Sequence, residues 1–202
     1  MIAGVLCQRK LPAVERWFKF EGQPTGNPPA FANSGYLANA KLNVLQGAFS
    51  FTSTGANTGL SIAVSGGLPI VQSENNFALG TNFYVEFYAT WVSPSASTRI
   101  VESDNGFAIR KAADGKIEIT TVLDVGAVIS TALSYDDNVK RKFKVTFIAG
   151  TVTLYVDNVI VGTGTSVITD YILSRSLIQF LIFAPISSSY YDDLIIQRNV
   201  IP

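Results

Sequence analysis

Apolar and polar residues alternate through Phe143–Thr165, and this is the clearest pattern in the chain. The apolar positions are Phe143, Val145, Phe147, Val152, Leu154 and Val156, and the residues between them include Lys144, Thr146, Thr153 and Tyr155. Alternation with a period of two predicts strands with one buried face. Ala149-Gly150 and Asp157-Asn158 interrupt the pattern, and Gly, Asn and Asp tolerate the backbone of tight hairpin turns. We therefore expect three antiparallel strands here.

Similar short patterns, separated by Gly, Pro, Asn and Ser, predict strands along most of the chain. The expected strands are Arg16–Phe20, Lys41–Leu45, Ala48–Thr52, Gly59–Val64, Asn82–Val92, Arg99–Ser103, Phe107–Lys111, Lys116–Val122, Leu177–Phe183 and Tyr190–Arg198. Asp114-Gly115 is a strong hairpin signal. Tyr171–Ser174 is compatible with a short helical turn, and no long amphipathic helix is expected. This pattern predicts a single all-β domain.

The longest expected strand, Asn82–Val92, divides its side chains between two faces. Its inward set is Phe83, Val85, Phe87, Ala89 and Trp91, and its outward set is Tyr84, Glu86, Tyr88 and Thr90. We expect a core between two sheets, formed by Phe83, Phe87, Trp91, Phe143, Phe147, Leu154 and Val156.

Four short motifs then follow one another in a familiar order. They are Trp17–Gly22 (WFKFEG), Phe83–Tyr88 (FYVEFY), Leu154–Asn158 (LYVDN) and Asp192–Ile196 (DDLII). In this order they resemble the laminin-G-like branch of the concanavalin A-like jelly rolls. The resemblance implies a two-sheet antiparallel jelly-roll sandwich that spans residues 1–202 as one domain. It does not fix the function, because this fold serves lectins, hydrolases, adhesion modules and particle proteins alike.

The chain is poor in charge. Its formal net charge is zero, charged residues make up 15% and hydrophobic residues 48% of the sequence, whereas about 25% charged residues is usual. A neutral chain gives no electrostatic reason to bind nucleic acid. Few charges also give weak protection against self-association. Two interpretations stay open: a large β-rich core, or a surface that neighbouring subunits cover.

The sequence lacks the residues that several kinds of catalysis require. The sequence has no histidine and one cysteine, Cys7, which removes the Ser-His-Asp triad and the common zinc motifs. Hydrolases of the resembled fold carry paired acids on one strand, about 5.5 Å apart. Here Glu86 and Glu118 each stand alone on their strands. We expect a protein without enzymatic activity.

The resemblance also implies calcium binding, on loops at the rim of the sheets, as a candidate property. The candidate ligands are Asp104, Asp136, Asp137 and Asp193. Calcium takes six to eight oxygen ligands, and no segment has a dense alternation of aspartates. The alternative is that these residues shape turns. No cofactor is expected, and calcium is left open.

Glycan binding needs exposed aromatic rings that stack on sugar rings. Tyr84 and Tyr88 share the outward face of one strand, and Tyr190 and Tyr191 begin the last one. These four tyrosines are the candidate glycan-binding residues. The alternative is ordinary packing between neighbouring strands.

Two segments suit contacts with other subunits. Met1–Leu11 is an apolar arm, and Glu21–Asn39 is a long loop rich in Pro, Gly and Asn; long loops are often functional or part of an interface. The candidate interface residues are Met1, Ile2, Val5, Leu6, Leu11, Pro28, Pro29 and Phe31.

These features lead to two functional hypotheses. The first is a structural or adhesive subunit of a larger assembly, most concretely a bacteriophage virion protein of the head-decoration, fibre or tail-associated kind. Met1–Cys7 is too short for the apolar core of an export signal, so we expect synthesis in the host cytoplasm and a place in the virion. Its partners would be other subunits or further copies of the chain, and also a host glycan. The alternative is a carbohydrate-binding module or lectin. Neither nucleic acid nor membrane is an expected partner.

Overall fold

The structure is a computed structural model, and it describes residues 16–18, 30–31, 42–46, 49–52, 61–64, 70–73, 79–91, 97–102, 107–121, 126–166 and 189–198. Within these ranges the chain forms fifteen strands and no helix. The strands are β1 (Arg16–Phe18), β2 (Ala30–Phe31), β3 (Leu42–Gln46), β4 (Phe49–Thr52), β5 (Ser61–Val64), β6 (Ile70–Ser73), β7 (Asn82–Trp91), β8 (Thr98–Glu102), β9 (Ala108–Lys111), β10 (Ile117–Thr120), β11 (Ile129–Ser130), β12 (Arg141–Ile148), β13 (Thr151–Val156), β14 (Val159–Thr165) and β15 (Ser189–Arg198). The described residues contain no helix able to span a membrane.

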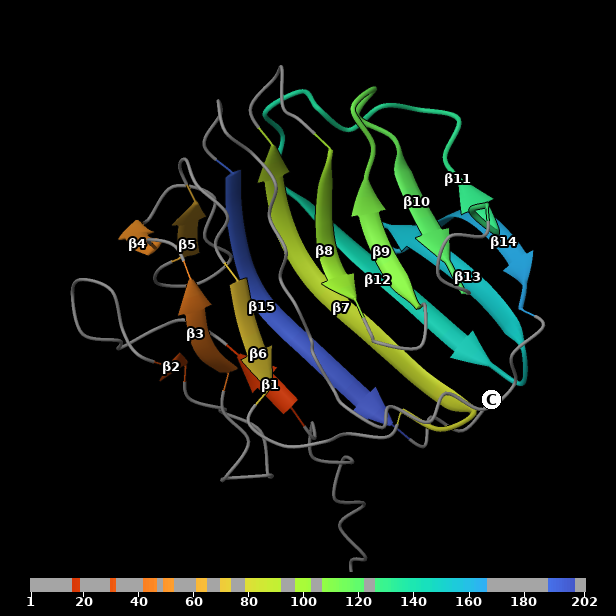
Figure 1. The fold of residues 1–202 in the computed structure, drawn as a ribbon. Coiled ribbons are helices and arrows are strands. Elements are labelled where there is room, and N and C mark those ends of the chain that lie inside the picture. The colour runs from red at the N-terminus through yellow and green to blue at the C-terminus, as the bar shows by residue number, and fades with distance from the viewer. Residues whose placement is uncertain are drawn as a thin grey trace, which may run out of the picture.

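The strands form one large sheet and two small ones (Figure 1). The large sheet has eight strands in the order β14-β13-β12-β7-β15-β5-β4, and β1 pairs with β15 beside this path. The second sheet runs β11-β10-β9-β8, and the third runs β2-β3-β6. Every pairing between described strands is antiparallel.

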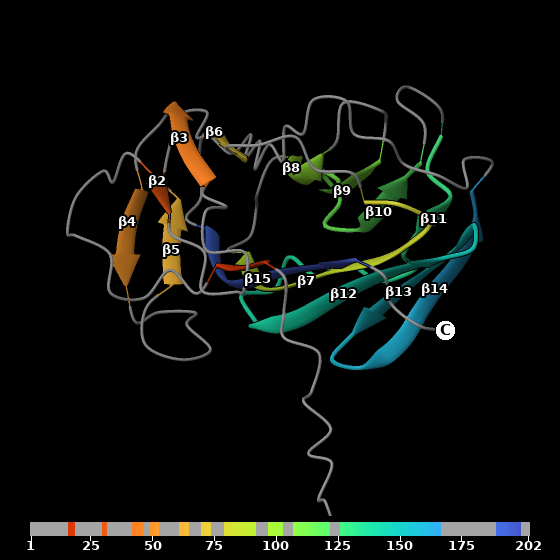
Figure 2. The same cartoon turned by 90° about the horizontal axis from the view of Figure 1, so that it is seen from below.

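The sheets stack in two layers. Figure 2 shows the long strands β15, β7, β12, β13 and β14 as one layer, with β8, β9, β10 and β11 lying over one face of it. Strands β3 and β6 lie on the same side of the large sheet as β8. The all-β, two-layer antiparallel sandwich expected from the sequence is therefore confirmed.

Alternation in β7 and β12 builds the core between these layers. The two strands pair from Arg141 opposite Ala89 to Ile148 opposite Asn82, so their apolar residues share one face. Phe83 stacks on Phe147 with ring centroids 5.1 Å apart, and Phe87 stacks on Phe143 at 5.5 Å. The seven core residues expected from the sequence are all buried: Phe83, Phe87, Trp91, Phe143, Phe147, Leu154 and Val156. The prediction of the core is confirmed.

The expected hairpin turns also occur where the dipeptides placed them. Ala149-Gly150 joins β12 to β13, and Asp157-Asn158 joins β13 to β14. All four residues have positive φ angles, between 47° and 84°, as the common two-residue hairpin turn requires. Gly115, between β9 and β10, has a φ of 80°.

Strand β14 lies close beneath β11 at the edge of the sandwich, and two glycines make this approach feasible. A Cβ atom at Gly164 would lie 2.5 Å from the carbonyl oxygen of Val128, and one at Gly162 would lie 2.6 Å from a methyl group of Ile129. No side chain fits between the two strands at these positions. The glycines thus let the second sheet close over the edge of the large one.

Several expectations differ from the structure or fall outside it. Strands β2, β6 and β11 were not expected from the sequence. Strand β1, Arg16–Phe18, falls within the expected Arg16–Phe20, whose last two residues lie outside the described ones. The expected strand Leu177–Phe183 and the helical turn Tyr171–Ser174 lie outside the described residues. The short elements carry too few residues to show a period, and β6 and β1 are defined by partners remote in sequence.

Truncating Phe147 to alanine should cost about 3–5 kcal/mol of unfolding free energy, because it removes the ring that stacks on Phe83 and leaves a cavity. Thr146→Ala, at the neighbouring position on the opposite face, is the control and should change stability by less than about 1 kcal/mol. Urea denaturation measures both. Equal losses in the two variants would contradict the assignment of the two faces.

Gly164→Ala should destabilise the protein by about 1–3 kcal/mol, because the new methyl group meets the backbone of Val128 and overpacking strains a core. Gly126→Ala is the matched control, since a Cβ atom there meets nothing within 4 Å. Thermal unfolding of both variants tests the close approach of β14 and β11. A Gly164→Ala protein as stable as the parent would refute it.

Candidate ligand-binding face

The side of the large sheet that turns away from the core carries a regular array of polar and aromatic side chains. We call it the outer face, and its central members are Tyr84, Glu86, Tyr88, Lys142, Lys144, Thr146, Thr153 and Tyr155. The strand register sets these residues in rows: Tyr155, Lys144 and Glu86 in one, and Thr153, Thr146 and Tyr84 in the next. All eight side chains are partly exposed.

Contacts between neighbouring strands hold this array in place. The Lys144 ammonium lies 4.4 Å from the centre of the Tyr84 ring, which is a favourable cation–π distance. Lys142 Nζ lies 2.9 Å from Glu86 Oε1 in an ion pair. Both contacts are diagonal between β12 and β7, where long side chains on one face can reach each other. These contacts hold the lysines beside the tyrosine rings.

Both tyrosine hydroxyls on β7 remain protonated at neutral pH. Partial burial raises the pKa of Tyr84, and the negative charge of Glu86 raises it further. Burial also raises the pKa of Tyr88, against the opposing effect of Lys142. Each hydroxyl can therefore donate as well as accept a hydrogen bond. The outer face thus offers rings, hydroxyls, ammonium groups and one carboxylate side by side.

The four tyrosines named from the sequence do not all lie on this face. Tyr84 and Tyr88 do, and Tyr190 does so by register, because it pairs with Thr90, two residues beyond Tyr88. Tyr191 faces the core and is 3% exposed. Its hydroxyl accepts a hydrogen bond of 2.8 Å from Trp91 Nε1, and burial raises its pKa. Tyr191 is a core residue here and offers no ring to a sugar.

Sequence reasoning did not name Tyr155, Lys142 and Lys144 as site residues. Each occupies an outward position in an alternating strand, so the period of two already placed them on this face. The alternation does not predict which strands are neighbours in the sheet. Only the pairing of β12 between β7 and β13 brings the two lysines next to Tyr84 and Glu86.

Three of the four proposed calcium ligands lie among the described residues, and the structure shows the surroundings of each. Asp137 pairs with Arg141 through two contacts of 2.5 and 2.6 Å, and this hydrogen bonding lowers the pKa of Asp137. Asp136 faces Lys111. Asp193 is buried in β15 with a φ of 48°, within a bulge of the strand. The described residues contain no group of three metal-ligating side chains, and Asp104 lies outside them.

The two glutamates considered as catalytic acids lie on different sheets. Glu86 is on β7 and pairs with Lys142, whereas Glu118 is on β10 and pairs with Arg110 at 2.5 Å. Of the candidate interface residues, only Phe31 lies among the described ones, in β2, which pairs with β3. Met1, Ile2, Val5, Leu6, Leu11, Pro28 and Pro29 lie outside them, so the expected docking arm stays a prediction.

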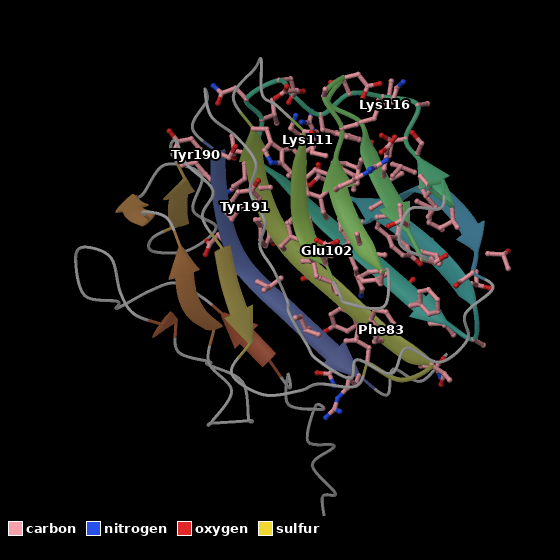
Figure 3. The ribbon with its side chains drawn as sticks, viewed as in Figure 1. Phe83, Glu102, Lys111, Lys116, Tyr190 and Tyr191 are labelled. Atoms are coloured by element: carbon pink, nitrogen blue, oxygen red, sulfur yellow. The ribbon has the colours of Figure 1, made fainter. Side chains whose placement is uncertain are left out.

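A buried lysine at one end of the sandwich was not expected. Lys111 ends β9, and its side chain is 0% exposed; Figure 3 shows it at the end of the sandwich opposite Phe83. Its Nζ lies 3.5 Å from Asp136 Oδ2 and 3.3 Å from the Ala112 carbonyl oxygen. Burial lowers the pKa of Lys111, and Asp136 opposes this shift. The pair ties the segment before β12 to the second sheet.

Comparison with known proteins finds similar solved structures and no similar family or curated sequence. No protein-family model matches the chain, and neither does any curated protein sequence. Among solved structures, the chain is similar to the binding domain of Paraclostridial Mosquitocidal Protein 1, with 15% identity and a TM-score of 0.71 over 94% of this chain and 50% of that one. The botulinum neurotoxin serotype D ligand binding domain in complex with N-acetylneuraminic acid gives 15% identity and a TM-score of 0.67 over 94% and 48%.

A third similar structure has nearly the same length as this chain. Domain 4 of AbnA, a GH43 extracellular arabinanase from Geobacillus stearothermophilus, in complex with arabinotriose, gives 12% identity and a TM-score of 0.67 over 94% of this chain and 95% of that one. The chain spans about half the length of the two toxin domains. At these identities, the similarity shows a shared β-sandwich fold.

Asp136→Asn should destabilise the protein by about 3–5 kcal/mol at neutral pH, because it leaves the buried Lys111 ammonium without its carboxylate. The loss should shrink as the pH rises above neutrality, since the pKa of Lys111 is lower in the folded than in the unfolded state and a neutral amine tolerates burial. Lys111→Met combined with Asp136→Asn should recover most of the stability. Urea denaturation at several pH values measures all three proteins. A single variant as stable as the parent would show that the pair is dispensable.

Proposed function

We propose that this protein is a carbohydrate-binding domain that recognises glycans on the outer face of its large sheet. The observation that carries the proposal is the array around Tyr84 and Tyr88, in which partly exposed rings lie among polar and charged side chains on a face that the core does not use. Aromatic rings offer flat apolar surfaces to the C–H faces of sugars, and neighbouring polar groups fix orientation and give specificity.

The chemistry of the face suits a sugar better than a hydrophobic partner. The large, well-exposed apolar side chains of the described residues are Leu133, Val139, Val159 and Ile160, and they lie at an end or edge of the sandwich. The centre of the outer face instead presents hydroxyls on Tyr84, Thr146 and Thr153. A polar ligand can exchange its hydrogen bonds with water for hydrogen bonds with these groups.

Lys144 favours a ligand with negative charge. Its ammonium lies over the Tyr84 ring, and no carboxylate pairs with it among the described contacts, whereas Lys142 already pairs with Glu86. An acidic sugar would bring a carboxylate to Lys144 beside the Tyr84 ring. Two of the similar structures were determined with N-acetylneuraminic acid and with arabinotriose, which supports testing both an acidic and a neutral sugar.

The virion hypothesis receives no support from the three similar structures described above, which are two binding domains of toxins and a domain of an arabinanase. A place in a viral particle and synthesis in a host cytoplasm stay predictions. They do not conflict with glycan recognition, because adhesive subunits of particles bind surface sugars too.

Titration calorimetry with sialyllactose and with arabinotriose tests the proposal. We expect binding of at least one of them, and a loss of affinity of about tenfold or more in Tyr88→Ala, because removal of a stacking ring costs on the order of 1–2 kcal/mol. Lys144→Ala should weaken the acidic sugar alone. Lys116→Ala is the matched control, since that lysine lies in the β9–β10 turn and pairs with Asp114.

Two outcomes would contradict the proposal. One is the absence of binding to a broad glycan array by the folded protein. The other is binding that Tyr84→Ala and Tyr88→Ala both leave unchanged, which would place the site elsewhere on the molecule.

A further inference from the structure

Among the described strands, β14 is the outermost of the large sheet, and no other described strand pairs with its second side. Its described partner is β13, from Thr151 opposite Thr165 to Val156 opposite Val159. An edge strand presents a row of backbone N–H and C=O groups that another strand can bind. No hydrogen bond joins the free side of Val159–Thr165 to another described residue.

The alternation of the backbone shows which groups are free. Ser166 donates its N–H to the Gly150 carbonyl, at 2.8 Å, on the β13 side. In an antiparallel ladder, successive residues direct their backbone groups to opposite sides. Gly164 and Gly162 therefore face β13, and the N–H and C=O groups of Thr163 and Thr165 point to the open side.

This edge lacks the protection that exposed strands usually carry. Native proteins protect edges with charged residues, proline or bulges. Neither β13 (TVTLYV) nor β14 (VIVGTGT) contains a charged residue or a proline. A bulge is present, but it lies near Ile160, where the register with β13 shifts. The stretch Gly162–Thr165 beyond it pairs regularly with Leu154–Thr151.

The side chains along this stretch also leave room for a neighbour. The glycines face the core beneath β11, so Thr163 and Thr165 carry the only side chains here, and both are exposed on the outer face. Threonines opposite each other across two strands pair favourably. Val159 and Ile160, which are 63% and 59% exposed, continue this edge toward the hairpin turn.

We propose that β14 is an interface for a second copy of this chain, which adds its own β14 in antiparallel register and joins two large sheets into one. A strand paired antiparallel with itself is self-complementary about a two-fold axis, so the free groups of Thr163 and Thr165 in each copy meet those of the other. The hairpin's single charge, Asp157, lies at its turn, and the antiparallel register places the two copies' Asp157 residues at opposite ends of the interface.

This interface goes beyond the proposed glycan binding and does not depend on it. The two-fold axis would stand perpendicular to the joined sheet, so both outer faces would lie on the same side of the dimer. Two equal sites on one surface raise the avidity for a glycan-covered surface without any new contact.

Sedimentation velocity of the full chain over a wide range of concentration tests the interface. We expect a monomer–dimer equilibrium, and Thr163→Lys combined with Thr165→Lys should raise the dissociation constant about tenfold or more, because charges on an edge oppose strand addition. The matched control is Thr151→Lys combined with Thr153→Lys, which puts the same charges on β13, whose backbone is paired on both sides. The control should dimerise almost as well as the parent.

Hydrogen exchange in the unaltered chain gives a second test that does not depend on the folding of a variant. The amides of Thr163 and Thr165 should exchange more slowly at high than at low protein concentration. A chain that stays monomeric throughout would overturn the proposal. So would a dimer whose formation leaves these amides unprotected, or one that binds only strands of another protein at this edge.

Discussion

The alternation of side chains in β7 and β12 is the constraint on which the rest of this structure depends. The two strands pair over eight positions, so every second residue of both enters the core. Phe83, Phe87, Phe143 and Phe147 stack in pairs there. Because successive side chains of a strand point to opposite faces, the same register brings Tyr84, Glu86 and the two lysines together outside. The core and the candidate site are two consequences of one pairing.

Contacts at the ends and edges of the sandwich hold the second sheet over the large one. At one end, Lys111 and Asp136 join β9 to the segment before β12, and Asn138 donates its N–H to the Trp91 carbonyl. At the edge, Gly162 and Gly164 allow β11 to lie close on β14. A buried ion pair contributes little net stability, and we infer that its value here is to fix the position of this segment.

The sequence predicts what is local and periodic in this fold. The expected strand Asn82–Val92 contains the whole of the observed β7, Asn82–Trp91, because its alternation is regular. Val92 lies outside the described residues. The alternation does not predict which of Tyr190 and Tyr191 is buried. Strand β15 carries a bulge between Asp192 and Ile195, and a bulge interrupts the period of two along the strand. Lys111 stands near a strong turn signal, which favours exposure, and its contact with Asp136, a residue remote in sequence, helps to make its burial tolerable. Pairing of β1 with β15 joins the two ends of the described chain, and no local pattern contains that information.

The central claim is that ligands bind on the outer face, and tyrosine side chains report on it directly. An NMR titration of the protein with labelled tyrosine rings, using sialyllactose as the ligand, would follow each ring separately. Our account predicts that the resonances of Tyr84, Tyr88 and Tyr155 shift together with saturation, while those of the buried Tyr135 and Tyr191 stay in place. Saturable shifts confined to other rings, with Tyr84 and Tyr88 unchanged, would contradict it.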